Sequence, residues 1–128
     1  MPAGARADEA YRVSENAFLR AVVDLAHLYS WLAVHHEKSA RKVGDRWISN
    51  IRGDRGSPDC LFVRPPRVIF AELKLGTRAR DERDHLPGGT YGLTADQVRW
   101  RDALLACPGV EYALWTPEDL DAIAAVLA

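Results

Sequence analysis

Two short apolar runs joined by a proline turn constrain the fold of this chain more than any other feature. The runs occupy residues 60–63 and 68–71, and Arg64-Pro65-Pro66-Arg67 separates them. β-rich runs on either side of a short Pro-containing segment are typical of a β-hairpin. With the turn centred on Pro65-Pro66, Leu61 pairs with Phe70 across the two strands. Because two prolines are not a favoured two-residue hairpin turn, we expect a wider turn with the same centre.

The same register gathers charged residues at the open end of the hairpin. Asp59 is placed opposite Glu72, with Cβ atoms roughly 4.5–5.5 Å apart, and Lys74 falls on the same face by the period-2 alternation of a strand. Two close carboxylates require a proton or a cation, and Mg²⁺ prefers carboxylate, water and phosphate oxygens. The pattern indicates an acidic metal site beside a lysine. The alternative is a surface turn in which Asp59 is a cap and Glu72 and Lys74 form an exposed strand pair.

Both faces of this hairpin are apolar. Leu61 and Phe70 fall on one face, and Phe62 and Ile69 fall on the other. A strand that is apolar on both faces is covered on both faces. We therefore expect helices on each side of the sheet.

The same periodicity rules predict the other elements. A helix runs from the N-cap Ser14 to Tyr29, and a strand follows at residues 31–35. Residues 36–55 are predicted as a polar loop that leaves room for one extra strand near Trp47. Thr94-Ala95-Asp96-Gln97 has the form of a capping box at the start of a helix. A strand at 111–115 and a last helix beginning at Pro117 complete the order α-β-β-β-α-β-α.

Length and composition exclude several classes of protein. The 128 residues suit a single domain, with residues 1–12 expected to be flexible and residues 76–92 expected to form a long loop. Cys60 and Cys107 lack the spacing of a zinc site or a disulfide framework, as is usual in a reducing compartment. No apolar run approaches the ~18 residues of a membrane span, and no signal-peptide core is present. We therefore expect a cytoplasmic protein.

Charge is distributed unevenly along a chain whose net charge is only −1. Residues 38–83 contain twelve basic and six acidic side chains, a net charge of 12 − 6 = +6, whereas residues 109–128 contain four acidic and no basic ones. A basic middle around the acidic pair suits a polyanion that arrives at one face, although a solvated mixed surface is the alternative. The candidates for contacts with a nucleic-acid backbone are Arg52, Arg55, Arg78 and Arg80.

These residues together resemble the PD-(D/E)XK nuclease superfamily. Within it, Gly56-x-Pro58-Asp59, Glu72-Leu73-Lys74 and Gln97-x-x-Trp100 most resemble the stand-alone virus-type replication-repair nuclease (VRR-NUC) domains of phages and bacteria. The resemblance covers residues 14–115, including a first helix that carries Glu15. It implies a restriction-endonuclease-like, three-layer α/β/α core with a central mixed sheet. It also implies a protein that works in the cytoplasm of a bacterium or of a phage-infected host.

The resemblance also implies a chemistry. Asp59, Glu72 and the backbone carbonyl of Leu73 would hold Mg²⁺, for which Mn²⁺ would substitute. Lys74 would position a water or neutralise the transition state, and Gln97 would orient Lys74, the water or a phosphate. Glu15 would complete the site through a water or a second metal. The alternatives are that Gln97 serves only the capping box, and that Glu15 is only a first-turn acid favoured by the helix dipole.

The implied function is that of a Mg²⁺-dependent DNA endonuclease acting as a homodimer on branched DNA, such as Holliday junctions, in repair and recombination. A restriction-like or nicking nuclease on duplex DNA and a non-catalytic DNA-binding module are the alternatives. The chain departs from the family in one respect, because twenty-two residues separate Lys74 from Gln97 where a short turn is usual. The added stretch is interpreted as a DNA-facing arm, a dimer contact or a disordered excursion.

Overall fold

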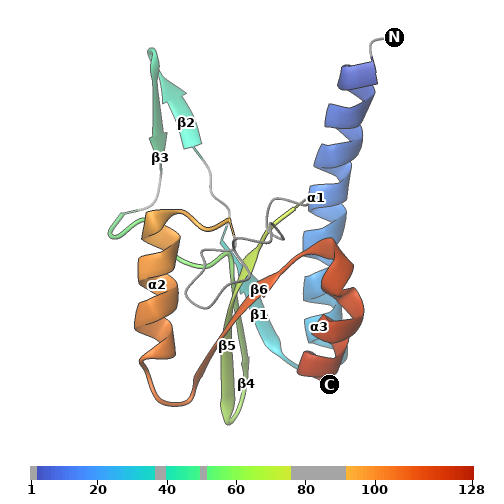
Figure 1. Ribbon diagram of the computed structural model, residues 1–128, viewed down its shortest axis with the longest axis vertical. Coiled ribbons are helices and arrows are strands. Elements are labelled where there is room, and N and C mark those ends of the chain that lie inside the picture. Colours follow the sequence, from blue (N-terminus) through green and yellow to red (C-terminus); the bar gives the residue numbers. More distant parts are fainter. Residues whose placement is uncertain (1–2, 37–39, 50–51, 76–91) are drawn as a thin grey trace.

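The computed structural model describes residues 3–36, 40–49, 52–75 and 92–128 (Figure 1). Most of the predicted 76–92 loop therefore lies outside the described residues. The elements in chain order are α1 (Ala3–Leu28), β1 (Leu32–His35), β2 (Ala40–Val43), β3 (Arg46–Ser49), β4 (Cys60–Arg64), β5 (Arg67–Leu73), α2 (Ala95–Leu105), β6 (Val110–Trp115), the 3-10 turn η3 (Pro117–Asp119) and α3 (Leu120–Leu127). No helix in the described ranges is long and apolar enough to cross a membrane.

The predicted hairpin is the centre of a four-stranded sheet in the order β1-β4-β5-β6. β4 is antiparallel to both β1 and β5, whereas β6 runs parallel to β5, so the sheet is mixed. Leu61 faces Phe70 and Val63 faces Val68, which confirms the predicted register. The expected wider turn was wrong. Arg64 already pairs with Arg67, so Pro65 and Pro66 alone form the turn, and the cis peptide bond between them is the defining feature of a type VI turn.

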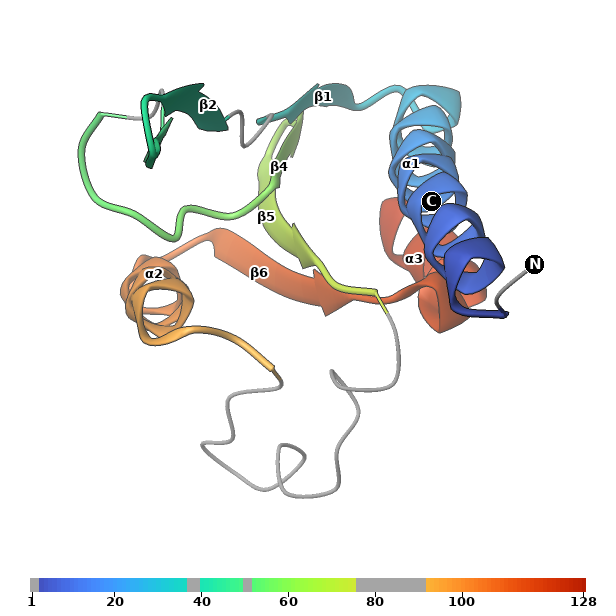
Figure 2. The ribbon, with the colours of Figure 1, turned by 90° about the horizontal axis from the view of Figure 1, so that it is seen from above.

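Helices lie on both sides of this sheet, which confirms the three-layer α/β/α prediction (Figure 2). α1 and α3 cover one face, where Phe62 and Ile69 are fully buried in the core. α2 lies on the other face, against β6. It does not extend over β1, where Leu32 and Val34 are 74% and 45% exposed. The described helices therefore cover the second apolar face only in part.

The closed end of the hairpin is fixed by two arginines. Arg64 donates hydrogen bonds to the carbonyls of Tyr29 (2.9 Å) and Leu127 (3.0 Å), and its guanidinium lies over the Trp31 ring. Arg67 forms two bonds of 2.8 Å to the carboxylate of Glu111, and this contact lowers the pKa of Glu111. The closed end of the hairpin is therefore joined to α3, to β6 and to the residue that follows α1.

The first helix is longer than its predicted length. α1 begins at Ala3 and contains Ser14, so the N-cap assignment at Ser14 and the start of the helix there were wrong. Residues 3–10 contain four alanines together with arginine and glutamate, which have high helix propensity, and this run extends the helix. Glu15 is consequently far from the first turn of α1, which removes the helix-dipole explanation for it.

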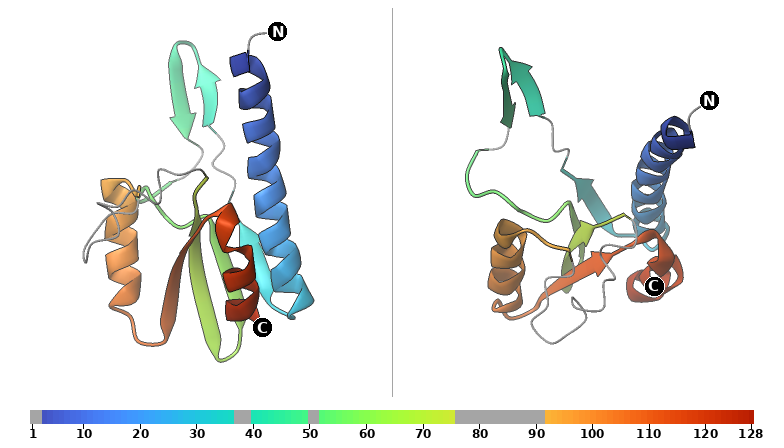
Figure 3. Two further views of the ribbon diagram at one scale, coloured as in Figure 1. Left: turned by 45° about the vertical axis from the view of Figure 1, so that its right-hand side comes forward. Right: turned by 45° about the horizontal axis from the view of Figure 1, so that its top comes forward.

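The polar segment before the hairpin also differs from the prediction. Instead of a loop with room for one strand, it contains two strands, β2 and β3, which form a separate antiparallel sheet (Figure 3). Gly44 and Asp45 make the turn between the closing pair Val43 and Arg46. Gly44 has a φ of +62°, and glycine at the first central position is typical of a type II′ hairpin turn. The core elements therefore follow the predicted order, with this hairpin inserted between β1 and β4.

Candidate active site

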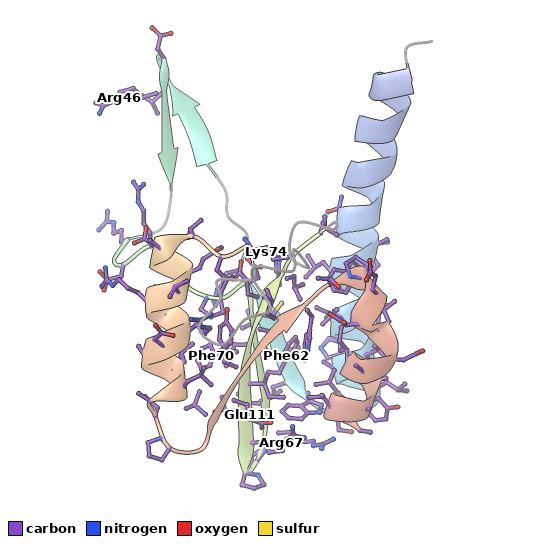
Figure 4. The ribbon with its side chains drawn as sticks, viewed as in Figure 1. Arg46, Phe62, Arg67, Phe70, Lys74 and Glu111 are labelled. Carbon is purple, nitrogen blue, oxygen red and sulfur yellow. The ribbon has the colours of Figure 1, made fainter. Side chains whose placement is uncertain are left out.

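The candidate site lies at the C-terminal end of β5, at the opposite end of the sheet from Arg67 and Glu111 (Figure 4). The Glu72 side chain is buried, with 1% of the residue exposed. Lys74 follows β5, and its amide donates to the carbonyl of Trp115 at 2.9 Å, which continues the pairing with β6. The Nζ atom of Lys74 is 4.0 Å from Oε1 of Glu72. The two side chains therefore share one face, as predicted, but they are not an exposed strand pair.

Asp59 is held against the same end of β5. Its carbonyl accepts a 2.8 Å hydrogen bond from the amide of His36, directly beyond the last pair of β1 and β4. Its Oδ2 atom accepts a 2.9 Å hydrogen bond from the amide of Leu73, between Glu72 and Lys74 in the chain. The Asp59 carboxylate is therefore turned toward β5 and not toward bulk solvent, so the surface-turn alternative does not describe this end of the hairpin.

Gln97 joins the two charged side chains of β5. Its Nε2 atom donates to Oε1 of Glu72 at 2.8 Å, and its Oε1 atom accepts from Nζ of Lys74 at 3.1 Å. The same Oε1 atom accepts from the amide of Thr94 at 2.9 Å, while the amide of Gln97 donates to Oγ1 of Thr94 at 3.2 Å. These last two bonds are the predicted capping box of α2. One side chain therefore both begins the helix and spans the ion pair.

The similarity of this chain to known proteins lies in its structure. Neither a protein-family model nor a curated protein matches the sequence. Among solved structures, one described as "VRR_NUC domain" aligns with a TM-score of 0.53 at 14% sequence identity, covering 88% of this chain and 95% of the other. This chain has the fold of a VRR-NUC domain. The fold implied by the sequence resemblance is thus confirmed.

The VRR-NUC fold here brings the loop before Asp59 against the start of α2. Gly56 has a φ of +92°, and a Cβ atom built on it would lie 2.6 Å from the backbone carbon of Asp96 and 2.7 Å from the amide nitrogen of Gln97. One turn further along α2, the indole Nε1 of Trp100 donates to the carbonyl of Arg55 at 2.9 Å. The loop that carries Asp59 is therefore fixed to the helix that carries Gln97.

Burial and nearby negative charge raise the pKa of two side chains near the site, Cys60 and Tyr112. The pKa of the buried Cys60 thiol is raised to about 12, first by burial and then by the charges of Asp59 and Glu72. The pKa of Tyr112 is raised by burial and then by Glu72, with a smaller contribution from Asp59. Both groups therefore stay protonated at neutral pH and are not nucleophiles.

The donor set at this position fits a hard divalent cation. In the described part of the chain, no three His, Cys, Asp or Glu side chains gather as a metal-binding group. Mg²⁺, however, is usually bound through one or two carboxylates together with waters and substrate phosphate. Asp59 and Glu72 supply oxygen ligands of this kind. The Oδ2 atom of Asp59 accepts from the amide of Leu73, the residue after Glu72, and the carbonyl of Leu73 is a further oxygen next to them in the chain.

The remaining predicted residues are placed only in part. Arg52 and Arg55 are exposed on the loop before Asp59. The backbone of Glu15 lies in α1, but its side chain is outside the described part of the structure, as are Arg78 and Arg80 entirely. Sequence reasoning assigned no role to Gly56 or Trp100 beyond their place in a motif. Their contacts join segments that are distant in the chain, and local patterns do not reveal such contacts.

The two roles of Gln97 can be separated by substitution. Gln97→Leu removes the hydrogen bonds of Gln97 to Glu72 and Lys74. We expect it to cost about 1–3 kcal/mol of stability and to lower the phosphodiesterase activity that the sequence resemblance implies about 10–100-fold. Thr94→Ala is the matched control, because it removes the cap at a cost of about 1 kcal/mol without touching the ion pair. Chemical denaturation and cleavage rates at a temperature where all variants are folded provide the measurements. Equal losses of activity in both variants would contradict a role for Gln97 at the site.

Proposed function

We propose that this protein is a Mg²⁺-dependent DNA endonuclease. The observation that carries the proposal is the buried Glu72, joined to Lys74 through Gln97 and flanked by Asp59, in a chain with the VRR-NUC fold. A buried carboxylate with a lysine beside it is costly to maintain for stability alone, because both charges lose hydration. A phosphodiesterase site gives this arrangement a purpose.

Each residue has a role in this proposal. Asp59, Glu72 and the carbonyl of Leu73 would hold Mg²⁺, with Glu15 completing the site through a water or a second metal. Bound there, Mg²⁺ would act as a Lewis acid on the phosphate and lower the pKa of a water. Lys74 supplies a fixed cation for the negative charge that develops on the phosphate, or positions the attacking water. Gln97 holds Lys74 and Glu72 in register, so little reorganisation is needed during the reaction.

The proposed substrate is branched DNA, including four-way junctions. Arg52 and Arg55, together with Arg78 and Arg80, would contact the phosphate backbone, and such contacts give strongly salt-dependent binding. A homodimer would supply the two sites that paired nicks at a junction require. Restriction-like or nicking activity on plain duplex DNA is the enzymatic alternative, and the substrate panel described next separates the two.

The test is a cleavage assay on labelled single-stranded, duplex, flap and four-way-junction DNA with Mg²⁺, Mn²⁺ or EDTA. We expect cleavage of the junction with either metal, none with EDTA, and none by Asp59→Ala or Lys74→Ala. Binding without cleavage of any substrate would refute the enzymatic function. Equal cleavage of all four substrates would retain the nuclease but remove its selectivity for branched DNA. Sedimentation of the protein alone tests the dimer.

A further inference from the structure

The β2–β3 hairpin stands apart from the rest of the described structure. It forms its own two-stranded sheet, and within the described residues it shares no strand pairing with the four-stranded sheet. Its tip is open, since Val43, Asp45 and Arg46 are exposed and no atom of the described residues lies within 4 Å of a Cβ built on Gly44. An isolated two-stranded hairpin is marginally stable in water. A projection of this kind is better explained by a binding partner than by a contribution to the core.

Charge identifies the class of partner. Residues 40–49 contain three basic side chains and one acidic side chain, a net charge of 3 − 1 = +2 in ten residues. In the observed register Arg41 is paired with Ile48, and Lys42 is paired with Trp47. Because strand residues alternate between faces, Arg41 and Lys42 belong to opposite faces of the ribbon. Positive charge on both faces of a narrow ribbon suits a partner that surrounds it with phosphates.

The hairpin lies at the same end of the molecule as the candidate site. Figure 4 shows Lys74 at the end of β5 nearest the hairpin, and Arg46 on the hairpin itself. In Figures 1 and 3 the hairpin extends beyond the end of the sheet, on the side of α2. The exposed Arg52 and Arg55 lie on the loop that returns from it to Asp59. Basic residues therefore continue from the site toward the tip.

We propose that the β2–β3 hairpin is an arm that binds duplex DNA next to the cleaved phosphodiester. A two-stranded β-ribbon has the dimensions to enter the major groove, where phosphates line both walls. Arg41, Lys42 and Arg46 supply phosphate contacts there. The arm supplies affinity and orientation, whereas the chemistry stays at Asp59 and Glu72. This inference rests on the proposed function for what is cleaved, but binding by the arm is measured separately.

The contribution of the arm's charge can be tested with variants that remove either positive or negative charge from it. Each variant is titrated against a labelled DNA duplex in EDTA over a range of salt concentrations. The combined variant Arg41→Ala, Lys42→Ala and Arg46→Ala is expected to bind at least about tenfold more weakly. Its slope of log K against log salt should fall by up to about 2.7, since each lost phosphate contact removes about 0.9. Asp45→Asn keeps a Gly-Asn turn and should bind more tightly. Arg20→Ala, which changes an exposed arginine of α1 outside the hairpin and the loop that follows it, is the control and should leave the slope unchanged.

A second measurement separates the arm from the catalytic site. Hydrolysis of bis(p-nitrophenyl) phosphate, which is too small to reach the hairpin, should be the same in the combined variant and the wild type. A variant with Gly-Gly in place of residues 40–49 should reproduce both results if its thermal denaturation is cooperative. Unchanged affinity and salt slope in the combined variant would refute DNA binding by the β2–β3 hairpin. If the wild type hydrolysed neither DNA nor the small diester, the proposed function would be refuted. The binding titrations would still show whether the hairpin binds DNA.

Discussion

Cleavage by Glu72→Gln is expected to fall on the order of 10³-fold below the wild type, while the protein remains fully folded. Glutamine has the shape of glutamate, and its Oε1 atom can still accept the hydrogen bond that Nε2 of Gln97 now donates to Glu72. What disappears is the negative charge, which the proposed function uses to hold Mg²⁺. The Glu72→Gln variant should therefore lose cleavage activity but keep the packing of the wild type.

Stability measurements on the same variant give an independent readout. Glu72→Gln removes a buried negative charge but also the ion-pair partner of Lys74, so the melting temperature in EDTA should stay close to that of the wild type. Mg²⁺ should raise the melting temperature of the wild type by mass action and have no such effect on the variant. An equal rise in both proteins would contradict a metal site at Glu72.

Glu111→Gln is the matched control for this substitution. Glu111 lies on the neighbouring strand β6, at the opposite end of the sheet, where it pairs with Arg67. The Glu111 side chain is 42% exposed, so loss of this salt bridge should cost less than about 1 kcal/mol. Cleavage should be unchanged. Comparing Glu72→Gln with Glu111→Gln thereby distinguishes the loss of a site carboxylate from the loss of one negative charge elsewhere on the same sheet.

The second large effect is expected for Gly56→Ala, which should destabilise the protein by about 2–4 kcal/mol. A methyl group there would come within 2.6–2.8 Å of atoms of Asp96 and Gln97, and overpacking of this kind costs about 1–3 kcal/mol. The positive φ of Gly56 adds about 1 kcal/mol. For a chain of this size the melting temperature should fall by about 10 °C. The α2 start should also shift, so cleavage per folded molecule should fall as Gln97 moves.

Gly53 provides the control on the same loop. Its φ is +98°, close to that of Gly56, but in the described part of the chain nothing lies within 4 Å of a Cβ built on it. Gly53→Ala should therefore show only the conformational cost of about 1 kcal/mol and retain cleavage. If chemical denaturation gave the two variants the same free energy of unfolding, the contact between Gly56 and α2 would not be a determinant of stability.

The parts of the fold that local patterns determine were predictable. Turn position and period-2 alternation gave the pairing of Leu61 with Phe70, and hence the shared face of Glu72 and Lys74. The capping-box pattern gave the start of α2 and the place of Gln97. These predictions depend on residues within one element or one hairpin, where side-chain direction follows from the backbone. The roles of these residues in catalysis stay predictions.

The errors arose where two local signals competed or where the contact was non-local. Ser14 is a good N-cap, but the alanine-rich run before it continues the helix, and propensity prevailed over the cap signal. The Gly44-Asp45 turn was not predicted because the strands that flank it carry charges in place of alternating apolar residues. The packing of Gly56 on α2 depends on the whole fold, so no nearby residue indicates it.

The two cysteines differ enough in position to make the protein easy to follow in solution. Cys60 is buried in the core, whereas Cys107 is exposed just beyond the C-terminal end of α2. An eleven-residue helix is about 16 Å long, and Gln97 and the hairpin both lie toward its other end. A thiol-reactive fluorophore should therefore attach at Cys107, away from both. The native sequence thus offers a single-point label for anisotropy titrations, without any engineered residue.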